Sequence, residues 1–333
     1  MIISNGSMNR LAGLLFFCAA VGLVTGCDDS ASTQPAPSAT PPAEDQLLFS
    51  SGRTGHSQLY TIAANGASGT LVRLLESDGD ALDAVWSPDG TRIAFTMKRG
   101  DAHTIYWIEA SGETVTPRAV TSPEHNQTYP AWSPDGESIL YTSYKYENAD
   151  ISRLAPDGAP DSRVDLTDVK YPGDETDEDF DEANWDACWS PDGLRMAFTS
   201  NRDDDWNIYT ASTEARVNPR DHVKITDHPA GDWDPAYSPD GEWLAFVSDR
   251  DGNPNIFVVS VSGDPVTLRR LTTSPHVDAD PAWSPDGEWI AYTAYPDGRS
   301  AIYVIAANGD PSTNQRVVAD PAGCWAPQWR PRP

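Results

Sequence analysis

Basic residues are scarce in this sequence: 23 lysines and arginines stand against 50 aspartates and glutamates, for a formal net charge of −27. Nucleic-acid binding needs a basic face, and so does adsorption to anionic lipid, so this balance argues against both. The acid excess instead favours a soluble surface and partners that carry positive charge. The length of 333 residues allows two domains or one large all-β domain.

The sequence also lacks an apolar run of the roughly 20 residues that span a bilayer. Fourteen residues from Leu11 to Val24 follow Arg10 and are typical of the apolar part of a signal peptide. The next residues, VTGC at Val24–Cys27, resemble a bacterial lipoprotein cleavage box, which implies cleavage before Cys27 and lipidation there. An ordinary secretory signal with a chance cysteine is the alternative. We expect a lipoprotein signal peptide over residues 1–26 and a disordered Pro-, Ser- and Ala-rich tether over 27–45.

Cysteine is rare beyond this segment, because only Cys188 and Cys324 lie in the body of the chain. Export would permit a disulfide between them. The repeat described below places the two residues on opposite sides of the molecule, too far apart to be bridged. We therefore predict that both are free and mostly buried.

Catalytic motifs are missing as well, since neither the GxSxG elbow nor the HExxH zinc motif occurs. The six histidines have no paired spacing, and we interpret them as solvated loop residues. They are His56, His103, His125, His222, His228 and His276. We predict a protein that is not an enzyme. The alternative is a metal-assisted polysaccharide lyase or hydrolase, for which His125 and His276 lie in suitable loops.

A short motif, SPDG, is what the sequence has in abundance. It begins at Ser87, Ser133, Ser190, Ser238 and Ser284, and the spacings are 46, 57, 48 and 46 residues. Another 46 residues lead to Arg330 in the degenerate sixth copy, WRPRP. A fixed period of this size indicates a repeat architecture. Pro and Gly suit the second and fourth positions of a tight turn, so we assign the motif's aspartates a structural role.

Each copy contains four short strands with no helical periodicity between them, which is typical of a propeller blade. The body opens at Gln46 on the second and third strands of a blade, and APQW at Ala326–Trp329 supplies an inner strand without a blade. We therefore predict an all-β fold over residues 46–333. It is a six-bladed β-propeller of four-stranded antiparallel blades, and its ring is closed when the C-terminal strand joins the N-terminal blade. Closure removes the free sheet edges.

The stretch PAWSPDGEWIAYTAYPDGRSAIYVIAANG, residues 281–309, resembles the PD40, or TolB-type, propeller repeat. The resemblance covers residues 46–333 and implies a TolB-like propeller. TolB itself is a periplasmic component of the Tol–Pal envelope system. It has an additional N-terminal α/β domain and no lipid anchor, whereas this chain has a tether in that place. Since one propeller fold hosts many tasks, the resemblance is specific for the fold rather than for the function.

Acids and tryptophans gather where the inner strands begin, which should be one mouth of the axial channel. Aligned on the aromatic residue that ends each inner strand, the acids lie three and five positions earlier and the tryptophans lie between them. The residues we select as binding a partner are Asp186, Asp232, Asp234, Asp278, Asp280, Trp185, Trp233 and Trp325. The extra residues of the 57-residue spacing lie in the strongly acidic segment Tyr171–Asp186, and we expect it to form a flap at the same mouth.

Three interpretations of this mouth compete. The aspartates could form hydrogen bonds with backbone N–H groups and be structural. They could bind Ca²⁺ across blades, since Ca²⁺ takes carboxylate and carbonyl oxygens. They could also attract cationic groups while the tryptophans stack on a peptide or a sugar. We favour recognition of an envelope protein or peptide, with a glycan as the alternative ligand, by a monomer that is anchored through Cys27. It would face the periplasm or the cell surface, and a purely structural spacer is the third hypothesis.

Overall fold

The computed structural model describes residues 40–110, 116–146, 148–167, 183–214 and 221–332. The expected signal peptide, the lipidation site at Cys27, most of the tether and most of the acidic flap lie outside these residues. In the part of the chain that is described, no helix is both long enough and apolar enough to cross a membrane.

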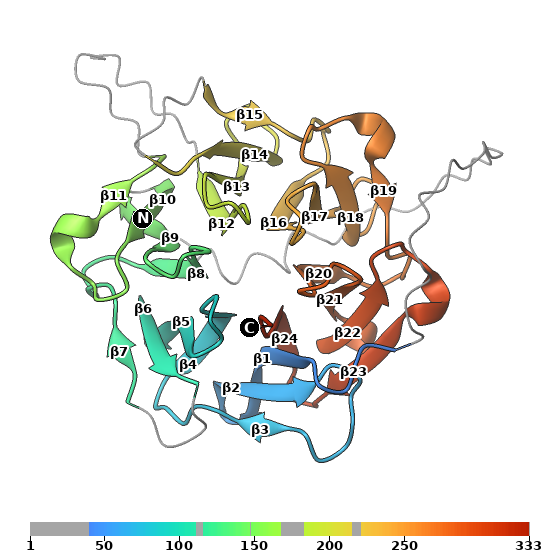
Figure 1. The fold of residues 1–333 in the computed structure, drawn as a ribbon, viewed down its shortest axis with the longest axis horizontal. Coiled ribbons are helices and arrows are strands. Elements are labelled where there is room, and N and C mark those ends of the chain that lie inside the picture. Colours follow the sequence, from blue (N-terminus) through green and yellow to red (C-terminus); the bar gives the residue numbers. More distant parts are fainter. Residues whose placement is uncertain (1–39, 111–115, 147, 168–182, 215–220, 333) are drawn as a thin grey trace. The chain divides into compact units, whose positions relative to one another are not determined.

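The predicted all-β propeller is confirmed. Residues 40–332 form six four-stranded antiparallel sheets, and each sheet is one blade (Figure 1). Blade 1 contains β4 (Asp80–Trp86), β5 (Arg92–Arg99), β6 (Ala102–Glu109) and β7 (Arg118–Ala119); blade 2 contains β8 (Gln127–Trp132), β9 (Ile139–Tyr146), β10 (Asn148–Leu154) and β11 (Val164–Asp165); blade 3 contains β12 (Asn184–Trp189), β13 (Arg195–Ser200), β14 (Asn207–Ser212) and β15 (Val223–Lys224). Blade 4 contains β16 (Asp232–Tyr237), β17 (Trp243–Ser248), β18 (Asn255–Ser260) and β19 (Arg269–Arg270); blade 5 contains β20 (Asp278–Trp283), β21 (Trp289–Ala294), β22 (Ala301–Ala306) and β23 (Gln315–Ala319); blade 6 contains β24 (Cys324–Trp329), β1 (Gln46–Thr54), β2 (His56–Ala63) and β3 (Val72–Arg73). Short 3₁₀ turns are η1 (Pro160–Ser162), η3 (Pro265–Thr267), η4 (Pro296–Gly298) and η5 (Pro311–Thr313).

Blade 6 is built from both ends of the body and closes the ring, as predicted. The C-terminal strand β24 pairs antiparallel with β1, with Leu47 opposite Trp329. An ion pair reinforces this junction, because the Arg332 guanidinium donates to both Asp45 carboxylate oxygens at 3.1 and 2.8 Å. Closure in this way gives blade 6 its inner strand, so that all six sheets have four strands and the inner edges left at the axis are short.

The core is divided among the boundaries between blades. In the described residues, each cluster of buried apolar side chains bridges two neighbouring blades, so that no blade buries its faces alone. The tryptophans that end three inner strands also reach back to the preceding blade. The indole N–H groups of Trp189, Trp283 and Trp329 donate to the carbonyls of Ala131, Ala236 and Ala282 at 3.0, 3.1 and 3.0 Å. Each of these indoles therefore adds a directional bond to apolar burial.

The SPDG motif forms the same turn five times on the face where the inner strands end, which we call the SPDG face. In blade 5 the Ser284 hydroxyl donates to Asp286 at 2.6 Å, and the same carboxylate oxygen accepts from the Glu288 N–H at 3.1 Å. The Ser hydroxyl in turn accepts from the Trp289 N–H at 2.9 Å. Gly287 is left-handed at φ +73°. The aspartates of this motif thus hold the turn, in agreement with the structural role assigned to them.

Closure through β24 predicts a large cost for truncating its last aromatic side chain. Trp329 is 6% exposed, and Trp329→Ala removes both its burial and its bond to Ala282. We expect the free energy of unfolding to fall by about 3–5 kcal/mol, measured by denaturant titration. The control is Val266→Ala at a side chain that is 89% exposed, which should leave stability unchanged. An equal response of the two variants would contradict the role of β24 in closure.

Candidate functional site

The candidate site is the inner-strand rim, which we define as the starts of the six inner strands. Its segments are Ala81–Asp83, Gln127–Tyr129, Asn184–Asp186, Asp232–Asp234, Asp278–Asp280 and Cys324–Ala326. The last residue of each segment is left-handed, with φ between +51° and +55°, and the strand register shifts there. Each inner strand therefore carries a β-bulge at this point. Four of the six bulge residues are aspartates, which tolerate this conformation better than most side chains.

The first residue of every rim segment is buried. Ala81, Gln127, Asn184, Asp232, Asp278 and Cys324 are all between 0 and 3% exposed. Of the predicted site residues, Asp232 and Asp278 thus lie inside the blade. Asp186, Asp234 and Asp280 are partly exposed beside them. The Asp280 carboxylate also accepts a hydrogen bond from the Ala326 N–H of the next inner strand at 3.3 Å.

In several blades an arginine donates a hydrogen bond to the buried first residue of the rim segment. Arg250 donates from one nitrogen to both carboxylate oxygens of Asp232 at 2.9 Å, and Arg202 donates to Asn184 at 2.9 Å. The same guanidinium groups lie over the aromatic pair formed by the second and third strands. Arg250 is 5.1 Å from the Phe257 ring centroid, and Arg202 is 4.5 Å from that of Tyr209. Each arginine thus combines a polar bond with a cation–π contact.

Blade 5 departs from this arrangement. Pro296 lies eighteen residues after Asp278, where Arg250 follows Asp232 and Arg202 follows Asn184. Within the described residues Asp278 forms no ion pair, and it accepts from the Ser274 hydroxyl at 3.1 and 3.0 Å. Burial raises the pKa of the Asp278 carboxyl to about 6. Blades 4 and 5 therefore bury an aspartate at the same position, but Asp232 faces a guanidinium group while Asp278 faces hydroxyl groups.

The tryptophans of the rim form an aromatic surface on blades 3 and 4. Trp185 stacks on Trp206, with ring centroids 4.5 Å apart and planes 7° from parallel. Trp206 lies just before β14, and its carbonyl accepts from the Asp232 N–H at 2.8 Å. Trp233 lies against Gly231, where a Cβ would come within 3.0 Å of the indole. Trp325 lies over Gly323 of blade 6 in the same way. All four indoles are partly exposed.

Trp185 also carries a buried polar group without a partner. Its indole N–H is buried, yet no described residue accepts a hydrogen bond from it. A buried donor without an acceptor is costly, so such groups tend to occur at strained or functional sites. The indole N–H groups of Trp86, Trp132 and Trp289 are in the same state, so this feature does not distinguish the rim.

The cysteines and histidines take little part in the rim's polar chemistry, apart from Cys324 at its buried position and His222. The prediction that the histidines are solvated loop residues is wrong for His222, because its Nδ1 accepts from the rim arginine Arg202 and burial lowers its pKa to about 3. Cys188 and Cys324 are free, as predicted, and burial raises the pKa of the Cys188 thiol to about 12. His276 is exposed, and its carbonyl rather than its ring accepts from Asn253 and Ser274. Among the described residues, no group of three His, Cys, Asp or Glu side chains is arranged to hold a metal ion.

Comparison with known proteins agrees with this architecture. Residues 161–267 match the PD40 family, described as the TolB beta propeller domain. The match covers less than half of the chain, whose propeller fold is similar to that of TolB structures. TolB from Acinetobacter baumannii superposes with a TM-score of 0.70 at 20% identity, over 88% of this chain and 68% of that one. Putative TolB from Agrobacterium tumefaciens gives 0.65 at 19% identity, over 85% and 91%.

Similar propellers also occur within enzymes. A puromycin-hydrolyzing peptidase of Mycobacterium tuberculosis gives a TM-score of 0.56 at 16% identity, over 82% of this chain and 42% of the peptidase. No curated protein sequence matches the chain. At these identities the likeness establishes the fold, and the TolB-like fold alone does not decide between binding and catalysis.

Sequence reasoning missed Trp206 and the rim arginines of this TolB-like propeller. Trp206 lies in the turn between the second and third strands, and that turn returns to the same face as the rim. The arginines had a periodic signal, because Arg99, Arg202 and Arg250 each follow the first rim residue of their blade by eighteen positions. Aligning the turns after the second strand, as well as the inner strands, would have revealed both.

The contrast between blades 4 and 5 predicts opposite effects of one substitution. Folded Asp278 titrates near pH 6 and an unfolded aspartate near 3.8, so the folded state retains the proton between these values. Its ionised form therefore costs stability that is absent below about pH 4 and complete above about pH 6. Asp278→Asn should raise the free energy of unfolding at pH 7.5 by up to about 3 kcal/mol, and the gain should vanish near pH 4.

Asp232→Asn is the matched control at the equivalent position. It removes the charge that faces Arg250, although an amide oxygen can still accept, as Asn184 does from Arg202. We expect a loss of about 1–3 kcal/mol at pH 7.5. Urea titrations of both variants at the two pH values measure these differences. A loss of stability in Asp278→Asn at pH 7.5 would contradict the assigned electrostatics.

Proposed function

We propose that this TolB-like propeller is a non-enzymatic envelope lipoprotein, anchored through Cys27, that binds a protein or peptide partner at the inner-strand rim. The observation that carries the proposal is the partly exposed Trp185–Trp206 stack beside the rim carboxylates. Flat indole faces bind aliphatic, aromatic and cationic side chains. The likeness to TolB structures supports a protein partner and an envelope location.

The predicted site residues divide into two roles in this proposal. Asp186, Asp234 and Asp280, together with Trp185, Trp233 and Trp325, are accessible enough to contact the partner. Asp232 and Asp278 are fully buried and act at a distance. Asp232 holds its strand start through Arg250, while Asp278 adds negative potential. With a net charge of −27 on the chain, the rim favours a partner segment that carries lysine or arginine.

A cross-linked pull-down from native envelopes tests the proposal with the full-length lipoprotein as bait. One variant changes Asp186, Asp234 and Asp280 to Asn, which also tolerates the left-handed conformation of these positions. A second changes Trp185 and Trp206 to Ala. The control changes Glu137, Glu242 and Glu288 to Gln, which removes the same number of charges from exposed positions on the SPDG face.

We expect wild type and the control to capture the same partner, and each rim variant to capture roughly tenfold less, since contact with a charged and aromatic hot spot is lost. Thermal melts establish that every bait is folded. Capture by both rim variants at the wild-type level would show that the partner binds elsewhere. An equal loss of partner capture in the Glu-to-Gln control would show that the rim variants act only through the overall charge of the protein. Repeating the capture in EDTA tests the alternative in which the rim binds Ca²⁺, since removal of the metal would then release the partner.

A further inference from the structure

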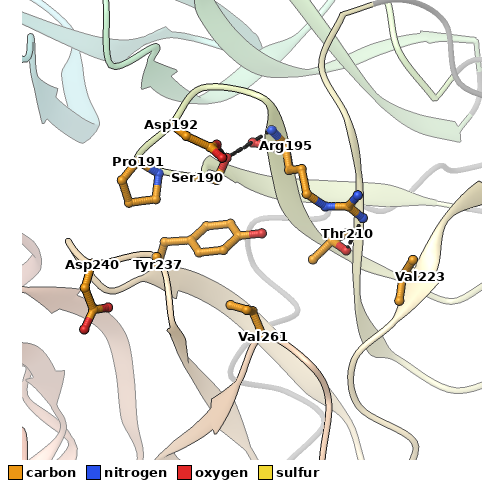
Figure 2. A pocket seen from close by; sticks show the side chains of 10 residues that line it. Ser190, Pro191, Asp192, Arg195, Thr210, Val223, Tyr237, Asp240 and Val261 are labelled. Atoms are coloured by element: carbon orange, nitrogen blue, oxygen red, sulfur yellow. Dashed lines mark hydrogen bonds between the residues drawn. The ribbon is translucent and has the colours of Figure 1, made fainter.

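A recess opens on the SPDG face between blades 3 and 4, away from the rim (Figure 2). Its volume is about 700 Å³, and its walls include Arg195, Thr210, Val223 and Tyr237. Asp192 and Asp240 of two successive SPDG turns also line it. Figure 2 shows the Tyr237 ring lying across this space, with the Arg195 side chain directed toward Thr210. None of these residues takes part in the proposed rim site.

Because the blades repeat, the recess can be compared with the same position at the boundary between two other blades. Arg92 and Arg195 each lie five residues after the serine of their SPDG turn, and Trp107 and Thr210 each lie twenty residues after it. Trp132 and Tyr237 end the inner strand of the following blade. Arg118 and Val223 both begin the fourth strand. The boundary between blades 1 and 2 is therefore the internal counterpart of the recess.

At the boundary of blades 1 and 2, two indoles and two guanidinium groups fill the space. Arg92 lies 4.6 Å from the Trp132 ring centroid and 5.6 Å from that of Trp107. Arg118 lies 4.8 Å from the Trp107 centroid. The Trp107 N–H donates to the Pro156 carbonyl at 3.1 Å. An arginine held between two tryptophans is thus the filled form of this boundary.

At the boundary of blades 3 and 4, the arginine is kept and three of its neighbours are smaller. Thr210 stands where the counterpart has Trp107, Tyr237 where it has Trp132, and Val223 where it has Arg118. Arg195 donates to the Thr210 hydroxyl at 2.7 Å in place of a ring stack. Val223 is 47% exposed. The missing volume is that of an indole above Thr210, within reach of a guanidinium group.

We propose that this recess docks a tryptophan side chain from a basic segment of a partner protein. The incoming indole would take the place that Trp107 occupies in the counterpart and stack on Arg195. Asp192 and Asp240, at the two turns that border the recess, would face basic residues on either side of the tryptophan. Charge complementarity with the acidic chain favours such a segment over an anionic aromatic molecule. The proposal is independent of the rim, because it concerns the opposite ends of the strands.

The test measures binding of the acetylated, amidated tripeptide Lys-Trp-Lys to the full chain by isothermal titration calorimetry. Thr210→Trp fills the recess from within, because it supplies the ring that Trp107 provides in the counterpart. We expect it to weaken binding at least ~10-fold, because the incoming ring has no space left. Tyr237→Trp copies Trp132, beside which Trp107 lies in the counterpart, and should retain binding. Arg195→Gln should weaken it by roughly threefold through loss of the cation–π contact. The matched control is Arg92→Gln, at a boundary that is already filled, and it should leave binding unchanged.

Saturable binding of Lys-Trp-Lys that is lost on filling, with the control unchanged, supports the proposal. Four results would overturn it: no binding to wild type, equal binding of Lys-Ala-Lys, unchanged binding in Thr210→Trp, or equal loss in Arg92→Gln. Equal affinity for free N-acetyltryptophanamide would also overturn the partner assignment, since it would make the recess a site for a small aromatic molecule. Thermal melts establish that the variants are folded.

Discussion

The whole structure depends on burial that no blade can achieve alone. Each apolar cluster lies between two blades, so every blade is stable only while both neighbours are in place. In a closed ring every blade has two neighbours, and the pairing of β24 with β1 completes the last blade of that ring. The reach of Trp329 back to Ala282 repeats the bond that Trp283 makes to Ala236. The C-terminal strand therefore joins the ring by the same contact as any other inner strand.

The same constraint determines the chemistry of the rim. An inner strand must start next to the axis and still pair along its length, and the left-handed bulge at residues such as Asp186 and Asp234 accommodates the change in direction. Aspartate is suited to that conformation, so a structural need accumulates carboxylates on one face. Structural and binding roles of these acids are consequently compatible. A partner would encounter a negative, tryptophan-bearing surface that the fold requires in any case.

Repetition made the fold predictable from the sequence, and it explains why the site was only partly so. The SPDG spacing and the unpaired inner strand at Ala326–Trp329 were sufficient to infer six blades and their closure. Side-chain depth was not accessible, because Asp232 and Asp234 look alike in sequence while only the second reaches solvent. The bulge reverses the alternation that a regular strand would give. Trp206 was missed because its contact with Trp185 joins two different strands of blade 3.

In a repeat protein, the informative positions are those where one copy departs from the others. Pro296 replaces the rim arginine of blade 5 and leaves Asp278 buried with hydroxyl partners. Thr210 and Tyr237 stand where the boundary of blades 1 and 2 has Trp107 and Trp132, and Arg195 lies beside an open recess. Packing alone would favour an arginine beside Asp278 and the two tryptophans beside Arg195, since they bury more surface and pair a charge. Both departures forgo that stability, and the second opens a recess to solvent, which is where a partner can be bound.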